Sequence, residues 1–382
     1  MSSPASARLD WSAGTLASVL PSVADSLGVP RFAGHDIFDL PPARRTVVVL
    51  VDGLGYDLLR QRSGHAPFLR QRLASASRVP CGFPTTTATS MATFGTGLPP
   101  GSHGLVGMQV LDPDTDRLLN ELSWEHGPDP LEWQPNETVF EAAESAGVSV
   151  TMIGPHYFEG SGLTSAALRG GRFRAAKALD DRVDAAVAAV RATPRALVYL
   201  YWGDVDKIGH VHGCQSWQWG DEVEAVDRAL ARLADRVPRD TSVVVTADHG
   251  MVDIPFQNRI DLAHEPELMS GIRHLGGESR CLQLYTENGS AAEVASTWRD
   301  ALGNRAQVLT REEVVDTGWF GPVDARVSPR IGDVVAVMRG SFAMVHSGRM
   351  RPQLVALLGL HGALSDAELA VPVIVVPPGA GA

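Results

Sequence analysis

Cysteine is scarce in this chain of 382 residues, which contains only Cys81, Cys214 and Cys281. An odd number of widely spaced cysteines argues against a disulfide framework and against a cysteine-based zinc site. The same pattern is typical of reduced thiols in a cytoplasmic protein.

Basic side chains are also few, with 33 lysines and arginines against 44 aspartates and glutamates, so that the formal net charge is −11. This balance argues against a nucleic-acid polymer or an anionic membrane as a partner. An acidic chain can still bind a phosphate group where metal ions reverse the local field. The charge therefore leaves small anionic ligands open.

Long apolar runs are absent as well. No stretch is long enough and free enough of charge to span a membrane. The first residues, MSSPASARLDWSAG, lack the basic start and apolar run of a secretory signal, and no repeat of solenoid period is present. We therefore expect a soluble, cytoplasmic protein with no membrane partner. The sequence makes no prediction of its oligomeric state.

Several short runs rich in β-branched residues predict buried strands. The run TVVVLV at 46–51 shows no alternation of polar and apolar residues, as expected for a strand covered by helices on both faces. Similar strands are expected at 148–153, 196–202, 242–247 and 373–376. Amphipathic helices are expected between them, for example at 54–73, 180–192 and after an N-cap at Asn136. This alternation predicts an α/β fold with a doubly wound, mostly parallel sheet and helices on both faces.

The pattern of elements changes near residue 254. From 254 to 345 we expect strands at 281–285, 306–309 and 331–338, and helices at 291–302 and 310–316. We interpret this stretch as a small α+β insertion or cap. The α/β core would then comprise residues 1–253 and 346–382.

A threonine cluster opens one of the predicted helices. Thr85, Thr86 and Thr87 follow a proline, and the helix ends near Gly95 and Gly97. A hydroxyl at a helix N-terminus lies beside unpaired N–H groups and the positive end of the dipole, where a phosphate binds readily. Taken alone, the pattern is more typical of a threonine that only caps the helix.

Acidic and histidine side chains follow several of the predicted strands. They form four clusters: Asp52; Asp206 with His210; Asp248 with His249; and His361. Aspartate and neutral histidine are the usual ligands of zinc and other first-row divalent ions, and an i,i+4 pair such as Asp206 and His210 projects to one helix face. Each cluster alone also fits an ordinary turn or cap. Their combination with the threonine helix predicts a metal site.

With these motifs the chain resembles the alkaline phosphatase superfamily and, within it, the nucleotide pyrophosphatase/phosphodiesterase branch. The resemblance runs from Val47 to Val376 and is weakest in the insertion. It rests on five stretches in order: VVVLVDGLG, FPTTTATSMATFGTGLPPGSHG, GDVDKIGHVHG, TADHGM and GLHGALSDAELAVPVIVV. It implies an alkaline-phosphatase-like fold and a hydrolase that acts on small-molecule phosphate esters.

The resemblance also implies two divalent metal ions, zinc or alternatively manganese. One ion would be held by Asp206, His210 and His361, and the other by Asp52, Asp248 and His249. Thr87 would bridge to the second ion as the nucleophile and form a phosphothreonine intermediate. The family pattern Phe-Pro-Thr-x-Thr is followed ten residues later by a glycine, and Gly97 fits only Thr87. Thr85 or Thr86 as nucleophile, and Asp204 as a competing ligand, stay open.

Two positions bear on the substrate. The diesterase branch carries an asparagine where this chain has Met108, which cannot donate a hydrogen bond to a phosphate oxygen. Arg280, in the glycine-rich segment HLGGESR, is a candidate phosphate or carboxylate contact, or else a surface salt-bridge residue. We expect a phosphodiesterase or nucleotide pyrophosphatase. The alternatives are a phosphomonoesterase or phosphonoacetate-type hydrolase on the same site, and a non-catalytic metal-binding homologue.

Overall fold

A seven-stranded sheet forms the core of the larger part of the computed structural model, which describes residues 9–379. The expected outer limits of the core, at residues 1 and 382, lie outside this range. In spatial order the strands are β2 (Ser77–Pro80), β17 (Ala370–Val376), β8 (Thr241–Thr246), β1 (Arg45–Val51), β7 (Ala196–Trp202), β5 (Ser149–Gly154) and β6 (Arg172–Ala175). The five from β8 to β6 run parallel, whereas β17 is antiparallel to both β8 and β2.

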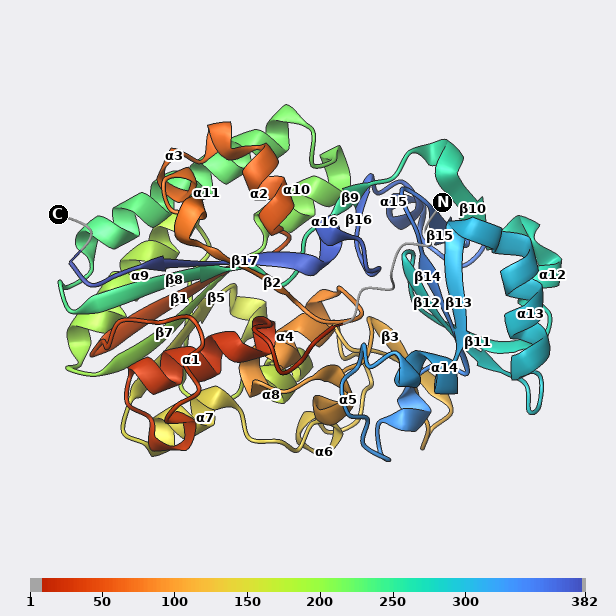
Figure 1. Ribbon diagram of the computed structural model, residues 1–382, viewed down its shortest axis with the longest axis horizontal. Coiled ribbons are helices and arrows are strands. Elements are labelled where there is room, and N and C mark those ends of the chain that lie inside the picture. Colours follow the sequence, from red (N-terminus) through yellow and green to blue (C-terminus); the bar gives the residue numbers. More distant parts are fainter. Residues whose placement is uncertain (1–8, 380–382) are drawn as a thin grey trace.

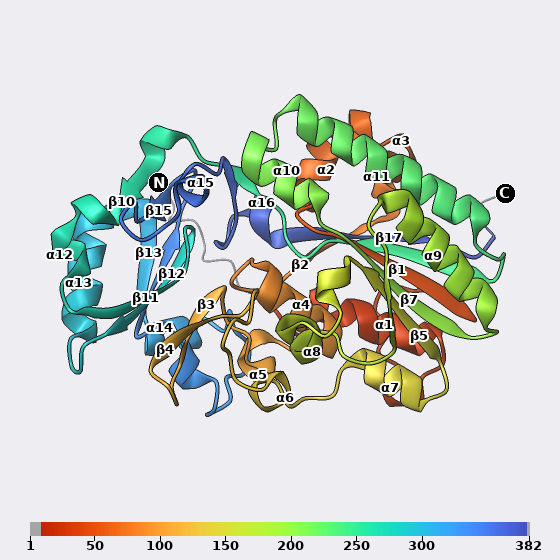
Figure 2. The ribbon, with the colours of Figure 1, turned by 180° about the vertical axis from the view of Figure 1, so that it is seen from behind.

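Helices cover both faces of this sheet, as Figures 1 and 2 show. On one face lie α2 (Tyr56–Gln61), α3 (Pro67–Arg70), α9 (Leu179–Ala192), α10 (Asp204–His212) and α11 (Trp217–Arg236). On the other lie α1 (Val19–Ser26), α4 (Thr87–Thr96), α7 (Val139–Ser145) and α8 (Gly162–Ala167). Strands β7 and β8 are buried at every position, which explains why their sequences do not alternate. The predicted doubly wound α/β fold is confirmed.

A second, antiparallel sheet is formed within the predicted insertion. Its order is β11 (Ile272–Glu278), β12 (Cys281–Thr286), β14 (Val334–Met338) and β13 (Ala306–Thr310). Val334, Ala336 and Met338 pack with Trp298 of α13 (Ala291–Leu302). The alternate residues Val335 and Val337 join the main hydrophobic core instead. The second sheet therefore packs with one face on the core, while the boundaries of the insertion stay a prediction.

Shorter helices and strand pairs, together with 3-10 turns, connect these elements. The helices are α5 (Pro100–His103), α6 (Pro130–Trp133), α12 (Pro266–Met269), α14 (Arg311–Asp316), α15 (Pro352–Val355) and α16 (Asp366–Leu369). The strands are paired as β3 (Gln109–Asp112) with β4 (Arg117–Asn120), β9 (Val252–Asp253) with β16 (Gly359–Leu360), and β10 (Arg259–Asp261) with β15 (Ala343–Val345). Within residues 9–379, every helix is too short or too polar to cross a bilayer.

Some local predictions were wrong for identifiable reasons. The helix expected at 54–73 is divided into α2 and α3, because Pro67 starts a new helix and disfavours helical backbone at Ala66. The helix expected to start after Asn136 is capped by Thr138, whose side chain forms a capping box with Glu141. Strand β11 forms in the glycine-rich segment HLGGESR and the two residues before it, where the sequence predicts no strand.

Candidate metal site

Parallel strands bring the predicted acidic clusters to one edge of the main sheet. Asp52 follows β1, Asp206 lies in α10 after β7, and Asp248 follows β8. The carboxyl ends of parallel strands meet at the same edge, where open α/β sheets bind ligands. Gly53 allows the close approach of these segments: it has a φ of 74°, and a Cβ there would lie 2.8 Å from the Cα of Asp206. The fourth cluster, His361, follows β16.

Two groups of side chains are arranged so that each can hold an ion. The first comprises Asp52, Asp248 and His249, and the second Asp206, His249 and His361, with the ligand atoms of each group within 4.8 Å of one another. His210 lies beside the second group, with its Nε2 3.3 Å from Asp206 Oδ2. The structure thus brings together all six Asp and His residues that the sequence singled out. His249 belongs to both groups.

Three carboxylate oxygens in this cluster have no hydrogen-bond partner although they are buried. They are Asp52 Oδ1, Asp206 Oδ1 and Asp248 Oδ2. Burial, and then the charges of Asp248 and Asp206, raise the pKa of Asp52 well above its usual value, although Tyr201 donates a hydrogen bond of 2.5 Å to it. Burial also raises the pKa of Asp206. Unpaired buried carboxylates are costly unless a cation compensates them, so the donor set fits divalent ions.

Each of the three histidines is oriented by a backbone carbonyl. The Nδ1 atoms of His210, His249 and His361 lie 2.7, 3.1 and 2.9 Å from the oxygens of Gly359, Gly250 and Thr85. A carbonyl oxygen only accepts, so each Nδ1 carries a proton, and each Nε2 faces the carboxylates as the ring atom that can ligate a metal. Burial and the neighbouring histidines lower the pKa of His361 well below its usual value, which keeps it neutral. This is the form that ligates metals.

The three threonines have different surroundings. The Thr85 hydroxyl donates to Ala363 O at 2.9 Å and accepts from Gly362 N at 2.9 Å, so it joins α4 to the segment that carries His361. Thr86 is the N-cap residue of α4. Thr87 is the first residue of that helix, and its Oγ1 lies 3.2 Å from His249 Nε2. Of the three, Thr87 is the one whose hydroxyl contacts a candidate metal ligand.

The model of the type I phosphodiesterase / nucleotide pyrophosphatase family matches residues 46–364. The chain belongs to this family. Among its relatives, an uncharacterized pyrophosphatase/phosphodiesterase of Schizosaccharomyces pombe is 25% identical over 54% of this chain and 44% of its own length. Human ectonucleotide pyrophosphatase/phosphodiesterase family member 5 is 22% identical over 76% of this chain. This chain spans 61% of that human protein.

Solved structures share the fold. Murine ectonucleotide pyrophosphatase/phosphodiesterase 5 superposes with a TM-score of 0.72 and 21% identity, covering 87% of this chain and 88% of that one. An inactive threonine-to-alanine variant of the murine protein has been solved with AMP. Phosphonoacetate hydrolase from Sinorhizobium meliloti 1021, solved with phosphonoacetate, gives a TM-score of 0.68 and 19% identity over 88% of this chain and 91% of that one. These likenesses establish an alkaline-phosphatase-like fold.

The two predicted substrate contacts, Arg280 and Met108, differ in burial and surroundings. Arg280 is fully buried, and its Nη2 lies 2.6 Å from Glu368 Oε2 while its Nε lies 3.0 Å from Glu368 Oε1. The structure therefore gives Arg280 an internal ion pair in place of the substrate contact that the sequence suggested. Met108 is half-buried just before β3, and its contact with substrate stays a prediction.

The open alternatives among the ligands are also located. Asp204 is the first residue of α10, and neither candidate metal group contains it. The sequence did not predict the contact of Glu278 with the site, where its Oε2 lies 3.3 Å from His361 Nδ1. The only sequence signal was its position in the segment HLGGESR. The contact itself has no local signature, because Glu278 ends β11 and His361 follows β16, far away in the sequence.

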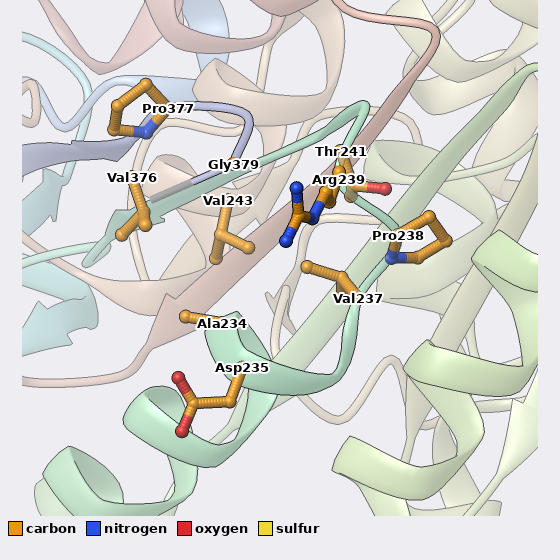
Figure 3. Close-up of a pocket in the computed structure, with 10 residues that line it drawn as sticks. All are labelled: Ala234, Asp235, Val237, Pro238, Arg239, Thr241, Val243, Val376, Pro377 and Gly379. Carbon is orange, nitrogen blue, oxygen red and sulfur yellow. The ribbon is translucent and has the colours of Figure 1, made fainter. Parts of the chain in front are cut away.

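A separate pocket of about 230 Å³ lies at the opposite edge of the main sheet, where α11 ends, β8 begins and β17 ends (Figure 3). Arg239 and Asp235 contribute its charged side chains, beside Val237, Val243 and Val376. None of the residues that line it belongs to the predicted site, so we assign it no role.

Proposed function

We propose that this chain is a metal-dependent phosphodiesterase of the nucleotide pyrophosphatase type, with Thr87 as its nucleophile. The observation that supports this most directly is the position of Thr87 Oγ1, 3.2 Å from His249 Nε2 at the start of α4. The inactive threonine variant of the murine relative and its bound AMP agree with such a role and with a nucleotide-like substrate.

Two divalent ions, zinc or alternatively manganese, would be held by Asp206, His210 and His361 and by Asp52, Asp248 and His249. When bound, such ions lower the pKa of a coordinated hydroxyl or water and offset charge on phosphoryl oxygens. The three unpaired carboxylate oxygens and the three Nε2 lone pairs are the atoms that fit them.

The chain's own groups would act as follows. The Thr87 hydroxyl loses its proton to water, and its oxygen attacks phosphorus. The bond between phosphorus and the ester oxygen breaks, and the alcohol leaves after taking up a proton. Water then attacks the phosphothreonine, which releases the phosphate monoester and restores the hydroxyl. The free N–H groups in the first turn of α4 bind the phosphoryl oxygens and stabilise the charge that develops on them.

A phosphomonoester or phosphonoacetate-type substrate is the second candidate. Met108 favours it, because methionine lacks the amide donor that the diesterase branch uses. The fold shared with the phosphonoacetate hydrolase of Sinorhizobium meliloti agrees with it. Both candidates use the same nucleophile and the same ions, so only the preferred leaving group separates them.

The deciding experiment compares bis-p-nitrophenyl phosphate, p-nitrophenyl phosphate and phosphonoacetate as substrates. The protein is stripped with a chelator and reloaded with zinc or manganese. Metal-dependent turnover that prefers the diester supports the phosphodiesterase. A preference for the monoester or the phosphonate supports the second candidate. If the protein binds two ions and turns over none of the three, both proposals are wrong and the protein is a non-catalytic metal-binding homologue.

We also propose that the protein works in the cytoplasm on a small-molecule phosphate ester. The three cysteines are unpaired and buried, as in proteins of a reducing compartment. Fractionation of the native host cell, followed by detection of the protein with an antibody, tests this. Recovery outside the cytoplasm would contradict it.

A further inference from the structure

Glu278 reaches the candidate metal site from the second sheet. It is the last residue of β11 and pairs with Cys281 across the tip of the β11–β12 hairpin. Its side chain is only 10% exposed, and its Oε1 is buried without a hydrogen-bond partner. Its Oε2 lies 3.3 Å from His361 Nδ1. A carboxylate from the predicted insertion is therefore in contact with the histidine of the core.

This contact distinguishes His361 from the other two histidines. Each of the three has a backbone carbonyl beside its Nδ1, but the contacts within residues 9–379 place a carboxylate beside Nδ1 only at His361. A carboxylate behind a metal-ligating histidine fixes the ring orientation and makes the other nitrogen a stronger ligand. Here that nitrogen is Nε2, which lies 3.9 Å from the unpaired Asp206 Oδ1.

The backbone around His361 is shaped to admit Glu278. Gly362 has a φ of 124°, and a Cβ at this position would lie 2.9 Å from both Cγ and Cδ of Glu278. A larger residue would therefore displace the carboxylate.

The same hairpin tip is anchored on its other side. Arg280 pairs with Glu368, and Glu368 Oε1 in turn accepts a hydrogen bond of 3.0 Å from Ala363 N. The tip is thus held against the segment that carries His361 by two independent contacts, one through Glu278 and one through Arg280.

We propose that Glu278 is a positioning residue of the metal site, which holds His361 with Nε2 directed at the ion shared with Asp206. The second sheet would then complete the site that the main sheet begins. This inference rests on the two-ion site of the proposed function. It needs no particular substrate.

The test measures metal affinity directly. Wild type, Glu278→Ala and Glu278→Gln are stripped and titrated with zinc against a chromophoric chelator. We expect Glu278→Ala to weaken one of the two binding events about 10- to 100-fold, as is usual for outer partners of metal ligands, and to leave the other unchanged. Glu278→Gln keeps an acceptor oxygen and should recover part of the loss. Glu287→Ala is the matched control, because Glu287 is exposed just after β12.

The outcomes separate this inference from the proposed function. If wild type binds two ions and Glu278→Ala binds both equally well, the role of Glu278 is overturned and the proposed function is untouched. If Glu278→Ala loses one ion but wild type hydrolyses none of the substrates, the proposed function fails and the role of Glu278 stands. A wild type that binds no ion overturns both. If the alanine variant does not fold, Glu278→Gln decides: unchanged affinity for both ions then overturns the role.

Discussion

His249 and His361 stack face to face, with ring centroids 3.8 Å apart and an interplanar angle of 24°. The first follows β8 and the second follows β16, so the stack joins distant parts of the chain at the metal site. Two imidazolium rings at this distance would repel each other, whereas two neutral rings pack well. The stack therefore agrees with the neutral form of His361, whose pKa burial and the neighbouring histidines lower.

Removal of metal should destabilise the folded protein. Without cations, the carboxylates of Asp52, Asp206 and Asp248 share one buried region in which one oxygen of each has no partner. Ions that bind only the native state add about 4 kcal/mol when their concentration is 1,000 times the dissociation constant. We expect the melting temperature to fall with a chelator and to recover with excess zinc but not with excess magnesium. Equal melting temperatures with and without chelator would contradict a metal site here.

Substitution of Thr87 should separate chemistry from metal binding. We expect Thr87→Ala to lower turnover by on the order of 10³-fold or more, because the nucleophile is lost, while zinc content stays near that of wild type. Thr87→Ser should keep part of the activity. Thr85→Ala is a useful comparison, because its hydroxyl bonds to Ala363 and Gly362. A Thr87→Ala enzyme as active as wild type would exclude Thr87 as the nucleophile.

Gly53 offers a test of how closely the strand ends must approach. An alanine there would need a φ of 74° and would place its Cβ 2.8 Å from the Cα of Asp206, which is backbone and cannot rotate away. We expect Gly53→Ala to lower the free energy of unfolding by roughly 1–3 kcal/mol and to weaken zinc binding. Gly64→Ala is the control, since a Cβ at that position would meet no atom within 4 Å beyond its chain neighbours. Chemical denaturation and zinc titration of both variants provide the measurement.

Much of the fold and part of the site could be predicted from local sequence patterns. Apolar runs such as 46–51 mark buried strands, and the rule for parallel sheets then places Asp52 and Asp248 at one edge. Pairing across sheets has no such local signature. Glu278 and Arg280 lie in a glycine-rich segment typical of a loop, yet β11 and its hairpin direct both side chains inward. Only the packing of the second sheet determines that.

Substitution of one partner in the buried ion pair of Arg280 and Glu368 should lower the stability of the protein strongly. Both side chains have no exposed surface, and Arg280 Nη2 lies 2.6 Å from Glu368 Oε2. Removal of one partner leaves a buried charge uncompensated, so we expect Arg280→Met to lower the free energy of unfolding by about 3–5 kcal/mol. Arg228→Met breaks an exposed pair with Glu224 and should cost less than about 1 kcal/mol. Similar decreases in the free energy of unfolding of the two variants, measured by urea denaturation, would show that the buried pair stabilises the protein no more than the exposed pair does.

Glu121 predicts a pH dependence of stability that is independent of metal. Burial raises the pKa of its carboxyl from 4.5 to about 8, although Trp133 Nε1 and Gly107 N both donate hydrogen bonds to it. Between these two values the native state holds a proton that the unfolded state has released, so native stability decreases as pH rises. The slope contributed by one such group is at most about 1.4 kcal/mol per pH unit, and it vanishes above pH 8.

Glu121→Gln should remove this slope, because the amide stays neutral at every pH. Urea denaturation of wild type and variant at pH 5.5, 6.5 and 7.5 should therefore show the variant gaining stability relative to wild type as pH increases. Glu125→Gln serves as the control, since Glu125 is exposed in the same segment and should leave the slope of wild type intact. Parallel pH profiles for wild type and Glu121→Gln would mean that Glu121 titrates near its ordinary pKa, and that its burial is offset by the hydrogen bonds from Trp133 and Gly107.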